Sequence, residues 1–415
     1  MTAQRRSALL IRDGRVEQRL RRATLFIGIL MSGGILLLPR LPLLAALTVL
    51  FVIVRGPAVL LRREVAGIWV LMLAVLAVAL IGGDAINLVP TATRYANFVG
   101  GLMLLGLYLE KPISVFERDL GWMLRLFSIQ ALITVVLATF VSGLFRSYQF
   151  DLATYKSIFL IFTYHVTLDE PSVIQRPDGF FYEPGVLQFY LNIFLYLSLF
   201  RTKNYRDAAL AGAAVLSTQS TTGVAIMIML LGVAVLRGLR RAGTTEKLLV
   251  LIFAPLLLVP MLVIGYSNYV EKTEGSLRGS SWAREYDLYT GFRIVSSHPL
   301  AGIGFDPNHY LEVAQEYGYL ESQLDMKNLS ERGNTNGLVV LAYSVGIPLF
   351  LIFMIGLFRQ GLFADTLIGV AIFIISQATE SLTLTPFFLM IMFSGLLMRP
   401  LPRRVASTRP AFGQK

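Results

Sequence analysis

Residues 337–358 read GLVVLAYSVGIPLFLIFMIGLF and contain no charged side chain. A helix needs about 20 predominantly apolar residues to cross the hydrocarbon core of a bilayer, and this stretch is long enough. The polar residues 267–336 precede it, and a further apolar run, 247–266, precedes those. A polar loop of this length between membrane helices is seldom a mere connector. The sequence therefore predicts a membrane protein with a large polar loop outside the bilayer.

The composition of the whole chain supports this interpretation. Of its 415 residues, 55% are hydrophobic and only 15% are charged, and the mean hydropathy is +0.64. Soluble domains carry about 25% charged residues. The net charge of +11 comes from basic residues in short groups between apolar runs, which is typical of membrane topology rather than of nucleic-acid binding. With no cysteine, and three histidines without a ligand spacing, we expect no disulfide, no metal and no cofactor.

Apolar windows predict an all-α integral membrane protein with about twelve transmembrane helices. Residues 1–22 form a basic segment without the cleavage site of a secretory signal. The polytopic domain covers 23–399, and 400–415 form a short tail. The predicted spans are 23–39, 41–58, 66–83, 95–110, 120–143, 184–200, 207–219, 221–237, 247–266, 337–358, 362–379 and 383–399.

The distribution of arginine and lysine gives the orientation of these spans. Cytoplasmic connections of membrane proteins are enriched in both residues. With a cytoplasmic N-terminus, basic residues fall in every second connection, from Arg55 to the tail after Arg399. The alternate connections are nearly bare of positive charge, except for two long loops at about 144–183 and 267–336. We therefore expect both termini in the cytoplasm and both long loops outside.

The spans 207–219 and 221–237 are shorter than a bilayer is thick. We expect them to form a helical hairpin whose polar tip, residues 217–223, sits below the membrane surface. Polar backbone at that depth is stable only where protein or a wet cavity surrounds it.

The first long loop ends in a conspicuous pair of charges, Arg176 and Glu183, just before Pro184 begins a span. Proline suits the first turn of a helix, and a carboxylate is favoured beside a helix N-terminus. Two interpretations are therefore open. Glu183 is a helix-start residue with Arg176 as its salt-bridge partner, or Arg176 binds an anionic substrate and Glu183 accepts a proton.

The second long loop contains Arg278, Arg284 and Arg293. Apolar residues at helical spacing over 282–294 predict an amphipathic helix at the membrane surface. Its arginines bind either lipid headgroups or a substrate. The helix ends before Pro299, and Gly302 and Gly304 then permit a bend in which backbone approaches a ligand. The loop closes with the polar cluster Asn334, Thr335 and Asn336.

Several arginines on an outer face suit the recognition of phosphate. Guanidinium groups bind phosphate bidentately and keep their charge at a membrane boundary. Two or three of them stabilise a diphosphate as a leaving group without a metal ion.

With these residues in place, the chain resembles the bacterial O-antigen ligase and polysaccharide polymerase superfamily of membrane glycosyltransferases. The resemblance covers about the C-terminal 60% of the chain. It is carried by RxxGxFxEP at 176–184, LSxxSxxG at 216–223, Arg284 followed by HPLxGIGF at 298–305, Asn336 with GIP at 346–348, and ESL at 380–382.

The resemblance implies inverting transfer of a glycan from an undecaprenyl diphosphate carrier on the outer face of the bacterial inner membrane. It implies that Arg176 and Arg284 hold the diphosphate, with Arg278, Arg293, the two glycines and the 334–336 cluster as further substrate-binding candidates. Ligases of the family have histidine and asparagine where the last external loop enters its span. Here that pair reads Thr335-Asn336, which favours a polymerase with Glu183 as the candidate base.

We therefore expect a polymerase that joins carrier-linked repeat units of O-antigen or exopolysaccharide. Its partners are the undecaprenyl-diphosphate-linked glycan and membrane lipids, with a chain-length regulator as a further candidate and no nucleic acid. The alternatives are a ligase that passes the glycan to lipid A-core or a protein, and a transporter or flippase of anionic substrates. The near absence of charge in the middle of the spans argues against transport.

Overall fold

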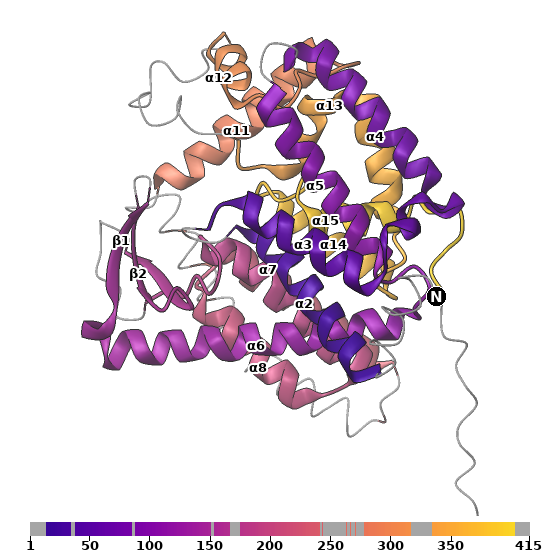
Figure 1. The fold of residues 1–415 in the computed structure, drawn as a ribbon. Helices are drawn as coiled ribbons and strands as arrows, with labels where there is room; N and C mark the ends of the chain where they lie inside the picture. The colour runs from indigo at the N-terminus through magenta and orange to yellow at the C-terminus, as the bar shows by residue number, and fades with distance from the viewer. Residues whose placement is uncertain are drawn as a thin grey trace, which may run out of the picture.

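The computed structural model of the chain is mostly helical, with one small sheet (Figure 1). It describes residues 14–34, 38–84, 88–150, 153–166, 175–240, 278–316 and 334–402, together with 243, 263, 266 and 270. The predicted span 247–266 and both predicted terminal segments fall largely outside these residues. The elements of the N-terminal half are α2 (Gly14–Gly33), α3 (Arg40–Val54), η1 (Pro57–Leu61), η2 (Arg63–Val65), α4 (Ala66–Ala79), η3 (Leu80–Asp84), α5 (Leu88–Gly106), α6 (Ile113–Phe140) and η4 (Ser142–Leu144).

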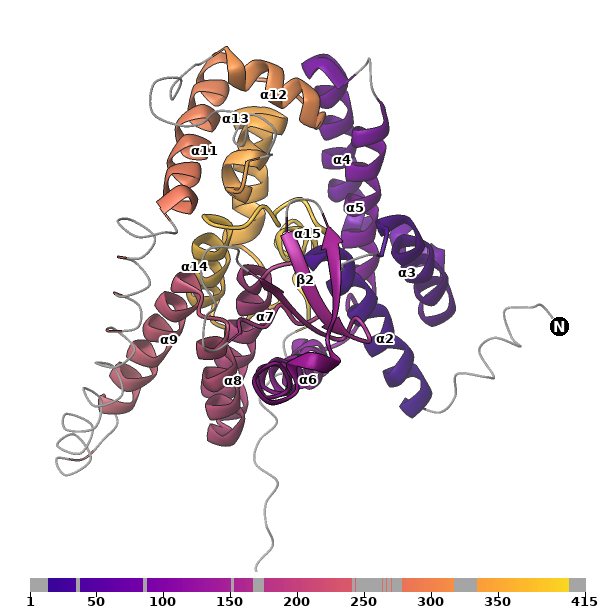
Figure 2. The same ribbon diagram turned by 90° about the vertical axis from the view of Figure 1, so that its left-hand side faces the viewer.

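After the sheet, the chain is helical again. Its elements are α7 (Pro184–Tyr196), η5 (Leu197–Thr202), α8 (Tyr205–Ser217), α9 (Thr221–Leu239), α11 (Arg278–Ser297), α12 (Pro307–Gln315), α13 (Gly337–Phe358), α14 (Thr366–Gln377) and α15 (Pro386–Ser394). Seen from the side, α12 lies above α13, between α11 and α4 (Figure 2).

Among the described residues, four helical segments are long and apolar enough to cross a membrane: Arg63–Gly82, Ile113–Phe140, Thr221–Leu239 and Gly337–Phe358. Two shorter apolar helices are Arg40–Val54 and Thr366–Gln377. These helices bear out a membrane protein of helical class, and the number of twelve spans stays a prediction.

The centre of the described fold is made of helices that are apolar on every side. Every residue of α15 is buried, and so are nearly all residues of α7. A helix that is apolar on all sides is expected to be enclosed by other helices in this way. Helix α15 packs closely on α5 and α13, and α7 packs on α8 and α9. Aromatic rings fill the space between them, including Phe189 against Phe388 with centroids 4.5 Å apart.

A three-stranded antiparallel sheet, which the sequence did not predict, occupies the first long loop. Its strands are β1 (Arg146–Phe150), β2 (Ala153–Ile158) and β3 (Phe162–Val166), in the order β1-β2-β3. Tyr155 pairs with Tyr148 on one side and with His165 on the other. The sheet stands at the C-terminal end of α6, where Phe145 and Tyr164 pack with Ala138 (Figure 1).

Apart from His165–Asp178 in the first long loop, the ion pairs in the described residues lie in or near the connections predicted to be cytoplasmic. Asp119, fully buried, accepts from Nε of Arg21 at 2.7 Å and from Nε of Arg22 at 3.0 Å. Other pairs there are Glu17–Lys111, Arg55–Glu110, Arg62–Glu110, Arg125–Asp207, Arg201–Glu117 and Arg237–Asp365. Charged side chains from connections far apart in sequence thus meet each other, as they would on one shared face.

Candidate functional site

The residues 175–183 of the first long loop are held in place by the sheet. Pro177 forms an isolated antiparallel bridge with Tyr164 of β3. The hydroxyl of Tyr155 donates to the carbonyl oxygen of Tyr182 at 3.0 Å. These contacts fix both ends of the stretch that carries Arg176 and Glu183.

A histidine–carboxylate pair strengthens the same junction. Nδ1 of His165 lies 2.9 Å from Oδ1 of the fully buried Asp178, and the Asp178 amide donates to the carbonyl of Thr163 at 2.8 Å. Burial raises the pKa of Asp178 to about 6, although the hydrogen bond with His165 acts to lower it. Although burial opposes an imidazolium, the hydrogen bond and charge of Asp178 raise the pKa of His165. The pair shares protons near neutral pH and links β3 to the loop.

Arg176 rests on the tip of the α8–α9 hairpin. Its Nε donates to the carbonyl oxygen of Thr218 at 3.0 Å. The two helices and their polar tip form as predicted, but α9 extends to Leu239 and is long enough to cross a membrane, so it is not the short span expected. The hydroxyl of Ser220 caps α9 by accepting from the Gly223 amide, and Thr218 and Ser220 are buried in protein. Burial lowers the pKa of Arg176 by disfavouring its charged form, yet arginine stays protonated at any physiological pH. A bound anion would offset that cost.

Glu183 precedes α7 as predicted, with Pro184 in the first turn. Its side chain does not cap the helix and is exposed. It interacts electrostatically with Arg176, but no salt bridge joins the two in the described structure. Of the two interpretations that the sequence left open, the salt-bridged helix start is therefore not the one observed. The carboxylate is accessible and close to a buried cation.

Arg284 reaches the same place from the second long loop. It lies in α11, which forms over the stretch predicted to be helical and packs one buried face on α13. Arg284 is part-buried and interacts electrostatically with Arg176. Neither arginine belongs to any salt bridge among the described residues. Arg176 also interacts electrostatically with the carboxylates of Asp178, Glu183 and Glu380, which partly offset the repulsion between the two arginines.

Arg293, a further arginine of α11, contacts Tyr289 and not this pair. Nε and Nη2 of Arg293 donate to the hydroxyl of Tyr289 at 3.1 and 2.9 Å, and its guanidinium lies over that ring. Arg293 is exposed. Arg278 is the first residue of α11, and its side chain lies outside the part of the chain that is described.

The expected role of Gly302 and Gly304 is corrected by their contacts. Both have positive φ, 65° and 80°, so the predicted bend is present. However, their amides donate to the carbonyls of His298 and Ser344, at 3.1 and 3.2 Å. A Cβ on Gly302 would lie 2.3 Å from the carbonyl oxygen of Tyr343. The backbone at Gly302 thus approaches α13 rather than a ligand, and the amides of both glycines are already hydrogen-bonded, so they do not bind a phosphate.

The cluster 334–336 joins α11 to α13. The Asn336 side chain accepts from the Val339 amide at 3.1 Å and so caps α13. The amide and hydroxyl of Thr335 both donate to Oδ2 of the buried Asp287, at 2.9 and 2.5 Å. Asn334 donates from Nδ2 to the Asp287 carbonyl at 2.7 Å. A structural reason thus exists for all three residues, and of them only Asn334 lines a described cavity.

Glu380 belongs to the site but was not among the candidates. It is 7% exposed, and it interacts electrostatically with Arg176. Its carboxylate packs on the first turn of α7, where a Cβ built on Gly185 would meet Oε1 at 1.8 Å. A carboxylate is favoured at such a helix N-terminus. The signal in the sequence was an acidic residue alone in a short external connection.

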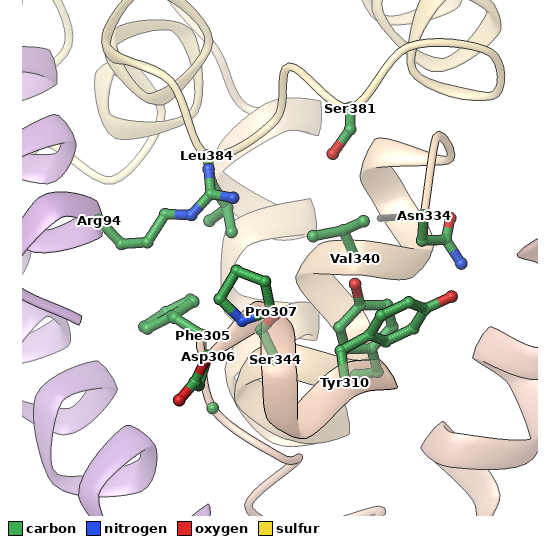
Figure 3. Close-up of a pocket in the computed structure, with 12 residues that line it drawn as sticks. Arg94, Phe305, Asp306, Pro307, Tyr310, Asn334, Val340, Ser344, Ser381 and Leu384 are labelled. Carbon is green, nitrogen blue, oxygen red and sulfur yellow. The ribbon is translucent and has the colours of Figure 1, made fainter. Parts of the chain in front are cut away.

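Two further arginines, Arg40 and Arg94, were missed, and Arg94 lines a cavity of about 100 Å³. Arg94 extends from α5 into this cavity, across from Asn334 and Tyr310 (Figure 3). Arg40, at the start of α3, interacts electrostatically with Arg94. Each stands in a short connection predicted to be external, where positive charge is rare. A positive charge in such a connection was the feature of the sequence that could have identified these two residues.

Taken together, the connections predicted to be external converge. Tyr182 interacts electrostatically with Glu183, Glu380 and Arg40. The arrangement offers cations for phosphate and an exposed carboxylate that can accept a proton. Among the residues described, no three His, Asp or Glu side chains are grouped to hold a metal ion, and a metal-independent site stays a prediction.

In comparisons with family models, with curated proteins and with solved structures, none matched this chain.

Proposed function

We propose that the chain is a membrane glycosyltransferase of the polysaccharide polymerase type. It would join oligosaccharide repeat units carried on undecaprenyl diphosphate, without a metal ion, on the outer face of a bacterial inner membrane. Its partners would be the carrier-linked glycan and the surrounding lipids.

The observation that carries this proposal is the meeting of Arg176 and Arg284. They come from two different loops and lie within electrostatic range of each other, with no salt bridge to a described carboxylate. Asp178, Glu183 and Glu380 partly offset the repulsion between the two guanidinium groups, and a bound dianion would interact favourably with both. A diphosphate is the anion that two bidentate donors suit best.

The chemistry follows from the groups at hand. A hydroxyl of the acceptor sugar attacks the anomeric carbon of the donor glycan, and the bond from that carbon to the diphosphate oxygen breaks. Arg176 and Arg284 stabilise the negative charge that develops on the leaving diphosphate. Glu183 accepts the proton of the attacking hydroxyl, which requires an accessible carboxylate such as this one. Attack opposite the leaving group inverts the anomeric configuration.

A polymerase is favoured over a ligase by the environment of Thr335. Its hydroxyl and amide are both hydrogen-bonded to Asp287, so this position serves to join α11 to α13. The resemblance to ligases would require a histidine base at this position, but the residue here is threonine. Glu183 is then the best-placed acceptor for the proton.

A deletion strain of the source bacterium tests the polymerase assignment. We expect carrier lipids that bear single repeat units to accumulate, measured by mass spectrometry of the extracted lipids. Accumulation of long carrier-linked polymer would instead identify a ligase, and unchanged carrier lipids would exclude both.

The role of Glu183 is tested by Glu183→Gln in the same strain. We expect polymer to fall by about 10² to 10⁴-fold, which is the usual contribution of a general base. Because the side chain is exposed and does not cap α7, the variant protein should reach the membrane in normal amount. Polymer at the level of the unaltered chain would remove Glu183 from the reaction.

A further inference from the structure

A cavity of about 470 Å³ lies beside the N-terminal part of α6, among connections that are predicted to be cytoplasmic. Residues of α2, α7, η5 and α8 complete its wall. The charged residues that line it are four arginines and two carboxylates: Arg22, Arg118, Arg125, Arg201, Glu117 and Asp207. None of them belongs to the candidate site described above. The cavity is therefore a separate space with more positive than negative charge in its wall.

Two of the four arginines are neutralised by the two carboxylates of the wall. Arg201 donates from Nε and Nη2 to the two carboxylate oxygens of Glu117, at 2.6 and 3.2 Å. Arg125 donates from Nε to Oδ1 of Asp207 at 2.9 Å. These two pairs leave Arg22 and Arg118 as the cations that remain for a ligand.

Arg22 and Arg118 each keep donors that no described carboxylate uses. Nε of Arg22 donates to Oδ1 of Asp119 at 3.0 Å, but Asp119 also accepts from Arg21 and so balances only one of the two charges. The guanidinium of Arg22 lies over the Trp122 ring, 4.9 Å from its centroid. Arg118 is exposed and forms no ion pair with a described carboxylate. Free guanidinium donors of this kind suit the oxygens of a phosphate.

Ser198 adds a hydroxyl to the same cavity. It lines the wall, it is 1% exposed, and its Oγ has no hydrogen-bond partner among the described residues. The buried Ser32 and Ser128, by contrast, donate to the carbonyl oxygen four residues earlier in their helices. Because a buried hydroxyl without a partner costs free energy, Ser198 would be stabilised by an oxygen of a bound ligand.

An exposed apolar face of α6 leads away from this cavity. Trp122, which lines the cavity, is exposed, and so are Leu126, Ile129, Ile133 and Val136. The spacing of four and three residues places all five side chains on one side of the helix. This helix is long enough to cross a membrane and runs as far as the sheet (Figure 1). A ligand whose charged head lies in the cavity would therefore have an apolar surface for a hydrocarbon chain.

We propose that this cavity binds the headgroup of an anionic phospholipid from the cytoplasmic leaflet. The phosphodiester would accept hydrogen bonds from Arg118, from the terminal nitrogens of Arg22 and from the hydroxyl of Ser198. An acyl chain would follow the exposed face of α6. The cytoplasmic leaflet contains anionic lipids, and basic pockets between membrane helices on that side suit their headgroups. The site does not depend on the proposed transfer reaction.

Titration of the purified full chain in detergent with dioleoyl phosphatidylglycerol, followed by native mass spectrometry, tests the proposal. Arg118→Gln should weaken binding by about tenfold or more, the effect of one hydrogen bond to a charged group. Arg118 is exposed and has no ion pair to a described carboxylate, so this change should not disturb folding. Arg206→Gln is the matched control, because Arg206 is also exposed but does not line the cavity.

Gly121→Leu fills the cavity without any change of charge. A Cβ on Gly121 would lie 3.8 Å from the nearest atom, a methyl carbon of Leu197, so the backbone has room for a side chain. Gly121 lines the cavity, and we therefore expect weaker binding of phosphatidylglycerol. Gly67→Leu in α4, where a Cβ meets nothing within 4 Å, controls for added bulk on a membrane helix.

Two further ligands distinguish an anionic lipid from other occupants. Dioleoyl phosphatidylethanolamine, which is zwitterionic, and glycerophosphoglycerol, which is the same headgroup without acyl chains, should both bind more weakly than phosphatidylglycerol. Equal binding of phosphatidylethanolamine would overturn selectivity for an anionic lipid. Equal binding of glycerophosphoglycerol would assign the cavity to a soluble phosphate instead. Phosphatidylglycerol affinity that neither Arg118→Gln nor Gly121→Leu alters would exclude this cavity as the site.

Discussion

The Nε–H of Arg176 donates a 3.0 Å hydrogen bond to the carbonyl oxygen of Thr218, at the tip of the α8–α9 hairpin. The bond uses one edge of the guanidinium. The two terminal nitrogens take no part in this bond, and Arg176 interacts electrostatically with Asp178, Glu183, Glu380 and Arg284. A fixed orientation of this kind is what bidentate recognition of a phosphate requires.

Replacement of Arg176 by lysine should therefore reduce transfer although the charge is kept. A lysine can hold either the Thr218 carbonyl or the diphosphate, but it lacks the planar fork that serves both. We expect polymer synthesis to fall by about 10²-fold, the usual effect of removing one donor to a developing anion. Polymer length and amount in cells would be measured, with Arg146→Lys, an exposed arginine of the same loop, as control. Equal output from the two variants would contradict a bidentate role.

Substitution of Gly185 by alanine should destabilise the site. The added Cβ would lie 1.8 Å from Oε1 of Glu380, and overpacking of this kind costs about 1–3 kcal/mol. We expect a lower Tm in detergent. The double variant with Glu380→Ala should recover part of the loss, because the clashing carboxylate is gone.

Gly232→Ala is the matched control for that experiment. Gly232 lies in α9, and a Cβ there meets nothing within 4 Å. Its replacement should raise stability slightly, by about 0.5–1 kcal/mol. A drop in Tm of the same size for both alanine variants would argue that the Glu380 contact is unimportant.

Stability should depend on pH through His165 and Asp178. The folded state raises the pKa of Asp178 from 3.8 to about 6 and raises the pKa of His165 from 6.5. Both groups thus bind protons more tightly when folded, so stability is present at acidic pH and is lost as the pH rises. The histidine part of this loss falls above pH 6.5.

His165→Gln should remove that upper part of the pH dependence. Tm would be measured across about pH 5 to 9, against His298→Gln, which replaces an exposed histidine. An unchanged slope above neutral pH in His165→Gln would show that the pair does not govern the stability of the loop.

Asn336 offers a test between a structural and a ligand-binding role. Its side-chain oxygen caps α13, so Asn336→Ala should cost about 1 kcal/mol, whereas Asn336→Asp keeps an accepting oxygen and should retain stability. Polymer synthesis by the aspartate variant should stay close to that of the unaltered chain. A stable Asp variant that makes no polymer would instead restore Asn336 to the substrate-binding residues.

Local features of the chain could be predicted because local physics decides them. The uncharged run 337–358 forms α13, the short apolar pair 207–237 forms a hairpin with a buried tip, and Pro184 begins α7. In each case apolar length, a capping side chain or a fixed proline φ acts within a few residues. The arginines of the two long loops were likewise identified by their departure from the positive-inside rule, whereas Arg40 and Arg94 were not.

The contacts that form the candidate site could not be predicted from local sequence patterns. The role of Gly302 depends on a carbonyl of Tyr343, and the environment of Thr335 depends on Asp287, both distant in sequence. The sheet that fixes Arg176 pairs short strands with little apolar alternation. Sequence alone thus determined a helical membrane protein with arginines in connections that are predicted to be external. Only the tertiary structure decided which of them meet, because electrostatic coupling depends on separation in space and not along the chain.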